Sequence, residues 1–117
     1  MRMRRLVCLL ALSCSLWTLA ANAAVPAVPT LTVTSNLCFG SNDVNWTAVS
    51  GATYYELWGS TFVNYTPQSL WYSGPFTSHS TTVNPIPNTF FHVRACNTSG
   101  CSAFSNTGVA RYYHGCS

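Results

Sequence analysis

Two cysteines five positions apart lie beside a histidine and an arginine in FFHVRACNTSGCSAFSN, residues 90–106. Such residues could form a metal site, a redox-active thiol pair or a disulfide. Structural zinc normally uses two close Cys/His pairs, whereas Cys96 and Cys101 are one close pair. Redox catalysis usually uses C-x-x-C at a helix N-terminus, where the helix dipole lowers the thiol pKa. A C-x₄-C spacing around a turn has no such dipole, so we expect neither a metal nor another cofactor.

The first 23 residues have the pattern of a secretory signal peptide. Three arginines within residues 1–5 precede an apolar run over 6–21, and Ala21-Asn22-Ala23 is a small-x-small cleavage site. The alternative is a membrane anchor, which needs about 20 apolar residues. The run is shorter and contains three polar residues, Ser13, Ser15 and Thr18. We therefore expect cleavage after Ala23, no membrane span in the mature chain, and a secreted or periplasmic location.

Cleavage would change the charge and the cysteine count. The whole chain has five Lys+Arg and two Asp+Glu, but three arginines leave with the signal peptide, and the remaining formal net charge is zero. Nucleic-acid binding needs a basic face, so this partner class is excluded. Four cysteines remain, Cys38, Cys96, Cys101 and Cys116. An even number in a short exported chain indicates disulfides, with three possible connectivities.

The elements that position these residues are predicted to be β-strands. Apolar residues alternate with polar ones in four segments, through Leu31 and Val33, Val44 and Trp46, Tyr55 and Leu57, and Phe91 and Val93. This period of two is typical of half-buried antiparallel strands. About seven strands with turns every 8–12 residues predict a β-sandwich over 29–117. Residues 24–28 are expected to form an extended and mobile lead-in.

Three motifs carry a family resemblance: DVNW at 43–46, SGATYYEL at 50–57 and VRACNTSGCS at 93–102. In this order and spacing they resemble a fibronectin type III domain, most closely its bacterial secreted form, over roughly residues 27–113. The resemblance implies an all-β, immunoglobulin-like, seven-stranded antiparallel sandwich. Thr89 stands where the family usually has a corner tyrosine, so we expect Pro85 and Pro87 to stiffen that corner.

The resemblance also implies one disulfide connectivity. Cys96 and Cys101 would flank the turn formed by Asn97, Thr98, Ser99 and Gly100, where Gly100 can adopt positive φ. Cys38 and Cys116 would meet at the opposite pole of the sandwich. Closing that longer loop would contribute about 4–5 kcal/mol to stability in the chain-entropy model.

The same resemblance argues against catalysis. It places Asp43 and Glu56, the carboxylates of the mature chain, on opposite sheets, whereas a glycosidase needs two carboxylates facing one cleft. The spacing of the histidines predicts no triad with a serine nucleophile. We expect all three to be solvated: His79, His92 and His114. The chain is therefore predicted not to be an enzyme.

What remains is a surface for binding. Tyr54 and Trp58 are expected to share an outer strand face with Glu56, next to Trp71 or Tyr72 on the neighbouring strand. Exposed Trp and Tyr suit protein contacts or stacking on sugars, although these rings could instead pack on one another. The turn Asn97–Gly100 is the second candidate surface. We predict a monomeric, secreted binding module for a protein or carbohydrate ligand. The alternatives are a structural spacer or envelope component without a discrete ligand, and a small secreted hydrolase.

Overall fold

The computed structural model describes residues 24–36, 41–61, 67–82 and 88–111. The strands in these residues are β1 (Leu31–Asn36), β2 (Ser41–Trp46), β3 (Tyr54–Ser60), β4 (Ser69–Gly74), β5 (Ser78–Thr82), β6 (Thr89–Asn97), β7 (Gly100–Cys101) and β8 (Gly108–Ala110). A search of this part of the chain finds no helix long and apolar enough to cross a membrane. The predicted signal peptide, Cys38, Cys116, Pro85, Pro87 and His114 lie outside the described residues.

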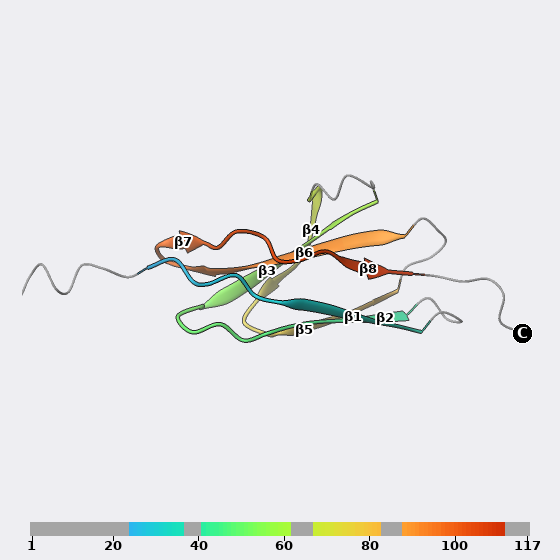
Figure 1. Cartoon of the computed structure of the whole chain (residues 1–117), viewed down its shortest axis with the longest axis horizontal. Helices are drawn as coiled ribbons and strands as arrows, with labels where there is room; N and C mark the ends of the chain where they lie inside the picture. Colours follow the sequence, from blue (N-terminus) through green and yellow to red (C-terminus); the bar gives the residue numbers. More distant parts are fainter. Residues whose placement is uncertain (1–23, 37–40, 62–66, 83–87, 112–117) are drawn as a thin grey trace, which may run out of the picture.

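Two antiparallel sheets pack face to face (Figure 1). One has the order β1-β2-β5, and the other has the order β4-β3-β6-β7, with β8 also paired to β6. Strands that are adjacent in the first sheet, such as β2 and β5, are far apart in the sequence. This arrangement confirms the predicted all-β, immunoglobulin-like sandwich.

The core lies between the sheets and follows the predicted alternation. The buried apolar residues are Leu31, Val44, Trp46, Tyr55, Leu57, Phe91, Val93, Ala95 and Ala110. Along β3 the side chains alternate between buried and half-buried, beginning with half-buried Tyr54 and buried Tyr55. Since alternate residues of a strand point to opposite faces, β3 contributes one face to the core and leaves the other available for a site.

The strand predicted after the Cys96–Cys101 turn is split into β7 and β8. Between them, the backbone N–H groups of Ser102 and Ser105 still donate to the carbonyls of Ala95 and Val93, at 2.7 and 2.8 Å. Their hydroxyl oxygens accept from the N–H groups of the same two residues, both at 3.0 Å. Serine side chains thus replace the regular ladder here, which lets the segment between them leave the sheet.

The lead-in makes contacts with the domain. Pro26 and Pro29 are buried, and the Ala24 carbonyl accepts a hydrogen bond from Asn97 Nδ2 at 2.9 Å. Val25 lies against Gly100. A β-carbon added at Gly100 would be 3.5 Å from Val25 Cγ2. Burial of the two proline rings favours this contact, because each Å² of apolar surface removed from water stabilises the folded state by about 25 cal/mol.

Candidate binding surface

The outer face of β3 and β6 holds Tyr54 and Trp58, two of the aromatic residues predicted for a binding surface, beside charged side chains. The strands pair antiparallel, with Tyr54 opposite Cys96, Glu56 opposite Arg94 and Trp58 opposite His92. Tyr54, Glu56 and Trp58 are all half-buried, while the residues between them are buried in the core. They therefore lie on one outer face, as the alternation predicts.

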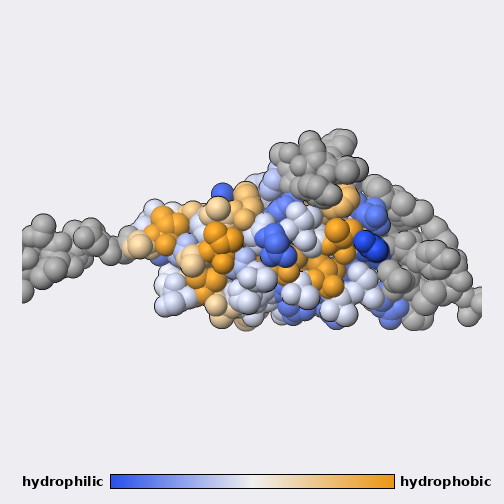
Figure 2. Space-filling view, viewed as in Figure 1, coloured by the Kyte–Doolittle hydropathy of each residue, from blue (hydrophilic) through white to orange (hydrophobic). Residues whose placement is uncertain are grey.

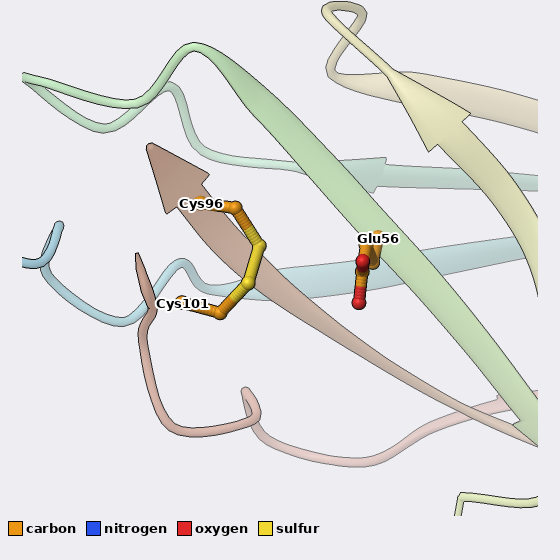
Figure 3. Close-up of side chains that lie close together, drawn as sticks. All are labelled: Glu56, Cys96 and Cys101. Atoms are coloured by element: carbon orange, nitrogen blue, oxygen red, sulfur yellow. A yellow bond between two sulfur atoms is a disulfide. The ribbon is translucent and has the colours of Figure 1, made fainter. Parts of the chain in front are cut away.

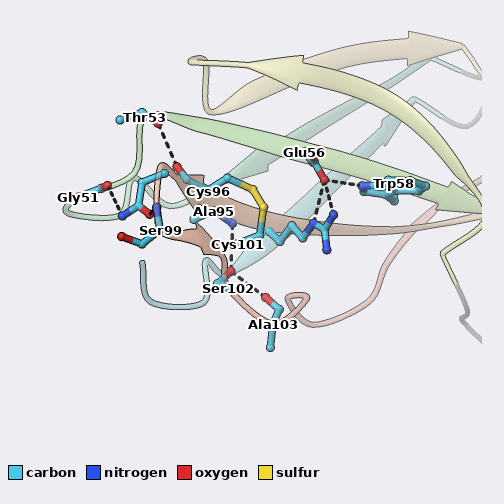
Figure 4. The surroundings of a disulfide bond; sticks show 12 residues. Gly51, Thr53, Glu56, Trp58, Ala95, Cys96, Ser99, Cys101, Ser102 and Ala103 are labelled. Carbon is cyan, nitrogen blue, oxygen red and sulfur yellow. Dashed lines mark hydrogen bonds and ion pairs between the residues drawn. A yellow bond between two sulfur atoms is a disulfide. The ribbon is translucent and has the colours of Figure 1, made fainter. Parts of the chain in front are cut away.

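Glu56 organises this face through one carboxylate oxygen. Its Oε1 accepts from Arg94 Nε at 2.8 Å and from Trp58 Nε1 at 3.1 Å, and Arg94 Nη2 lies 2.7 Å from the same oxygen. Figure 4 shows these bonds converging on the Glu56 carboxylate. The side chains of Arg94 and Glu56 are 31% and 17% exposed. This partial burial reduces solvent screening of the ion pair, so Glu56 holds both neighbours in place.

Phe104 completes the cluster. Arg94 Cζ lies 4.9 Å from the centre of the Phe104 ring and 5.9 Å from that of Trp58. The two rings meet edge to face at 6.4 Å. A cation over an aromatic face is attracted by the ring quadrupole. The attraction holds the Arg94 guanidinium and the two rings in contact. Together with Pro67 these three residues line a shallow, open pocket of about 230 Å³.

No sequence pattern predicts the position of Phe104. It lies in the segment between β7 and β8, and it turns onto the outer face because that segment leaves the ladder between Ser102 and Ser105. The one signal is a lone aromatic residue among small ones in the stretch SAFS. That signal indicates a contact but not which face is covered.

His92 is buried rather than solvated, which corrects the prediction. It is 7% exposed, its Nε2 lies 2.8 Å from Thr107 Oγ1, and its ring meets Phe104 at 6.3 Å. Within the described part of the chain its Nδ1 is buried without a hydrogen-bond partner. Burial lowers the pKa of His92 below its ordinary value of 6.5. His79 is half-buried against Tyr72, with ring centres 5.6 Å apart.

Trp71 and Tyr72 lie on β4 next to β3, but both rings turn toward the core side. A bulge shifts the register, so that Leu70 rather than Trp71 pairs with Trp58. The Trp71 ring meets the buried Phe91 ring at 5.0 Å, and Tyr72 meets Trp46 at 6.0 Å. An inserted residue reverses the alternation locally, so Trp71, although 37% exposed, does not lie beside Tyr54 and Trp58 as expected.

The disulfide joins Cys96 to Cys101 with an S–S distance of 2.07 Å. The Glu56 carboxylate and both sulfurs lie within 4.8 Å of one another (Figure 3). Metal coordination by cysteine requires thiolates, and both sulfurs are used in the disulfide. The Glu56 carboxylate also already accepts from Arg94 and Trp58. This cluster therefore lacks the donors of a metal site in the oxidised protein.

The second candidate surface is partly occupied by the chain itself. Asn97 Nδ2 donates to Ala24 O and, at 3.2 Å, to Gly51 O, and Asn97 Oδ1 accepts from Ser99 N at 2.8 Å. Gly100 has a φ of 137°, the positive value expected at this turn. Thr98 and Ser99 form its exposed tip. Asn97 thus fixes the turn rather than facing an external ligand.

The carboxylates lie on opposite sheets, as predicted. Asp43 is in β2 and accepts from Ser80 Oγ at 2.7 Å, while Glu56 is in β3 of the other sheet. Two acids held apart in this way do not face one cleft, which is the arrangement that glycoside hydrolysis needs.

Solved structures with this architecture are known, although no model of a protein family and no curated protein matches the chain. A crystal structure of FN3tt is 25% identical, with a TM-score of 0.67, over 80% of this chain and all of that one. The sixth fibronectin type III domain of human fibronectin type III domain containing protein 3 is 19% identical, with a TM-score of 0.66 over 84% and 95%. An Fn3-like protein from Clostridium thermocellum is 20% identical, with a TM-score of 0.59 over 76% and 92%. These likenesses, together with the two antiparallel sheets, show that the chain has the fold of a fibronectin type III domain.

Proposed function

We propose that this domain is an exported, non-catalytic binding module for a protein or carbohydrate at or outside the cell envelope. Its contact surface is the outer face of β3 and β6 around Tyr54, Trp58, Arg94 and Phe104, which we call the outer aromatic face. The observation that carries this proposal is the Glu56 carboxylate, which holds Trp58 and Arg94 beside an open pocket.

Preorganisation supports a binding role. Trp, Tyr and Arg are the residues that most often dominate the energy of protein contacts. Ordering such side chains on binding costs roughly 0.5–1.5 kcal/mol each. Here the hydrogen bonds to Glu56 already order Trp58 and Arg94 in the free domain, so a ligand would meet less of that cost.

The surface pattern suits a small contact. On the face drawn in Figure 2 apolar residues form separate patches among hydrophilic ones. A large obligate interface is more apolar than this. The domain therefore fits a ligand held at a few residues, with the turn Asn97–Gly100 as a secondary contact through Thr98 and Ser99.

The test compares Trp58→Ala and Phe104→Ala with Phe76→Ala, a matched control whose aromatic side chain is 68% exposed. Binding to glycan arrays and to purified envelope proteins would be measured for the folded variants. We expect a ligand of the wild type to lose about thirtyfold in affinity with Trp58→Ala, the effect of about 2 kcal/mol at a hot spot. Equal binding by all variants would overturn the outer aromatic face as the contact surface, and no binding by the wild type would favour the structural spacer.

The hydrolase alternative has a separate test. If hydrolysis of any substrate accompanied binding, Asp43→Asn and Glu56→Gln together should abolish it, because these are the carboxylates on the described strands. We expect no turnover to begin with, since two acids on opposite sheets cannot flank one bond.

A further inference from the structure

We propose that the pocket lined by Trp58, Pro67, Arg94 and Phe104 takes one ring of a neutral glycan. This inference deepens the proposed function and rests on it. It commits the outer aromatic face to an uncharged sugar rather than to an acidic sugar or a peptide. Three properties of the pocket lead to this ligand: its charge, its remaining hydrogen-bonding atoms and its apolar walls.

The charge of the pocket is already balanced. Among the described residues that line it, Arg94 is the one cation, and Glu56 contacts the guanidinium through both Nε and Nη2, at 2.8 and 2.7 Å. An anionic ligand would have to compete with that carboxylate for Arg94 and would lie close to its negative charge. Like charges placed together oppose binding. The ion pair therefore selects against acids and leaves neutral ligands unaffected.

The remaining polar group on the pocket wall is a donor. Among the described residues, the bonds from Arg94 to Glu56 start at Nε and Nη2, and Arg94 is the polar residue that lines the pocket. Arg94 Nη1 therefore stays available to a ligand. A hydroxyl group accepts as well as donates, so a sugar hydroxyl can accept from Nη1.

The walls of the pocket are apolar and small. The edge-to-face rings of Trp58 and Phe104, together with Pro67, form its sides. Aromatic rings with a polar neighbour suit ligands that are apolar on one face and polar at the edge, as a pyranose ring is. The volume of about 230 Å³ is below the roughly 300–1,000 Å³ of sites for drug-sized ligands. It therefore suits one ring of a longer chain.

The experiment titrates the isotope-labelled domain with three probes and follows the indole N–H signal of Trp58 by NMR. The probes are neutral oligosaccharides of glucose, mannose and N-acetylglucosamine, an oligogalacturonate as the acidic counterpart, and a proline-rich peptide. We expect a neutral oligosaccharide to shift this signal and the oligogalacturonate to bind at least about tenfold more weakly. Trp58→Ala, followed through its backbone amide signals, should abolish binding, and Phe76→Ala should leave it unchanged.

A second variant tests the role of charge directly. Glu56→Gln keeps the shape of the side chain but leaves the Arg94 cation unmatched, so affinity for oligogalacturonate should rise about tenfold through a charge-assisted bond. Its near-UV circular dichroism would establish that the fold is intact. Unchanged selectivity in a folded Glu56→Gln domain would overturn the charge argument.

The outcomes separate this inference from the proposed function. Tighter binding of oligogalacturonate than of every neutral sugar by the wild type would overturn the neutral-glycan inference. So would a Trp58-dependent shift with the peptide alone, which would leave the binding module intact with a different ligand. If none of the probes shifts Trp58, the inference fails. If glycan arrays and envelope proteins also show no Trp58-dependent binding, the proposed function fails with it.

Discussion

At the scale of single residues, Glu56 and His92 are two polar side chains beside a pair of contacting rings. Glu56 bonds to Trp58, and His92 contacts Phe104. Glu56 is paired with Arg94 and also accepts from Trp58. His92 has one partner, Thr107, and among the described residues its second ring nitrogen has none. Burial of a ring nitrogen without a partner makes the protonated, charged form of His92 costly. The stability of the domain should therefore depend on pH through His92.

We expect the domain to lose stability in acid through His92. Because burial lowers its pKa in the folded state, the unfolded chain takes up a proton first as the pH falls through about 6.5. The stability is fully present above that pH and decreases below it. Urea unfolding at pH 8, 6.5 and 5 would measure the change. His92→Gln should weaken this pH dependence and His79→Gln should not; equal dependence in wild type and His92→Gln would contradict the prediction.

At the scale of elements, the segment between β7 and β8 shows how a strand can leave a sheet without losing its hydrogen bonds. The Ser102 and Ser105 hydroxyls accept from Ala95 N and Val93 N and donate to the carbonyls of Ala103 and Asn106. The backbone between them is therefore free to carry Phe104 to the outer face. The Asn106 side chain also binds both Leu31 N and Leu31 O, at 2.8 and 2.9 Å, which ties β1 to this segment.

Replacing Ser105 with alanine should destabilise the domain by about 1–3 kcal/mol, the cost of leaving a buried N–H without its acceptor. Ser102→Ala should have a similar effect, since both serines are 8% exposed. Ser73→Ala, at an exposed position of β4, is the matched control and should change little. Urea unfolding measures all three, and an effect of Ser105→Ala no larger than the control would contradict this role.

Removing the Cys96–Cys101 disulfide should cost about 2 kcal/mol in the chain-entropy model, because the closed loop is short. The double variant Cys96→Ala/Cys101→Ala would be compared with the oxidised wild type by urea unfolding. The fold should remain, since β6 stays paired with β3 over its length. A variant as stable as the wild type would indicate that the turn is held by Asn97 alone.

At the scale of the whole molecule, the domain has one modest core and few charges. A chain of this size buries a smaller fraction of its surface than a large domain does, so the Cys96–Cys101 disulfide and a packed lead-in contribute noticeably. Residues 24–29 reach from the predicted cleavage point to β1, and their buried prolines join the lead-in to the sandwich.

Export predicts a mature protein that begins at Ala24. The intact mass of protein collected from periplasm or medium should correspond to residues 24–117, because Ala21-Asn22-Ala23 is the small-x-small site. A cell-associated product that retains residues 1–23 would support the membrane-anchor alternative instead.

The sequence by itself determined the β-strands, the inward residues and the Cys96–Cys101 turn. A period of two is a local property that adjacent residues reveal. It therefore predicted that Trp46 and Phe91 are buried, as they are. It likewise placed Tyr54, Glu56 and Trp58 on one face.

Only the tertiary structure decided which aromatic residues complete that face. The bulge in β4 reverses the alternation and turns Trp71 toward Phe91. The break between β7 and β8 brings Phe104 over Arg94 and buries His92. These outcomes depend on contacts between residues distant in the chain, and one inserted residue or one missing ladder bond changes the face to which a side chain points.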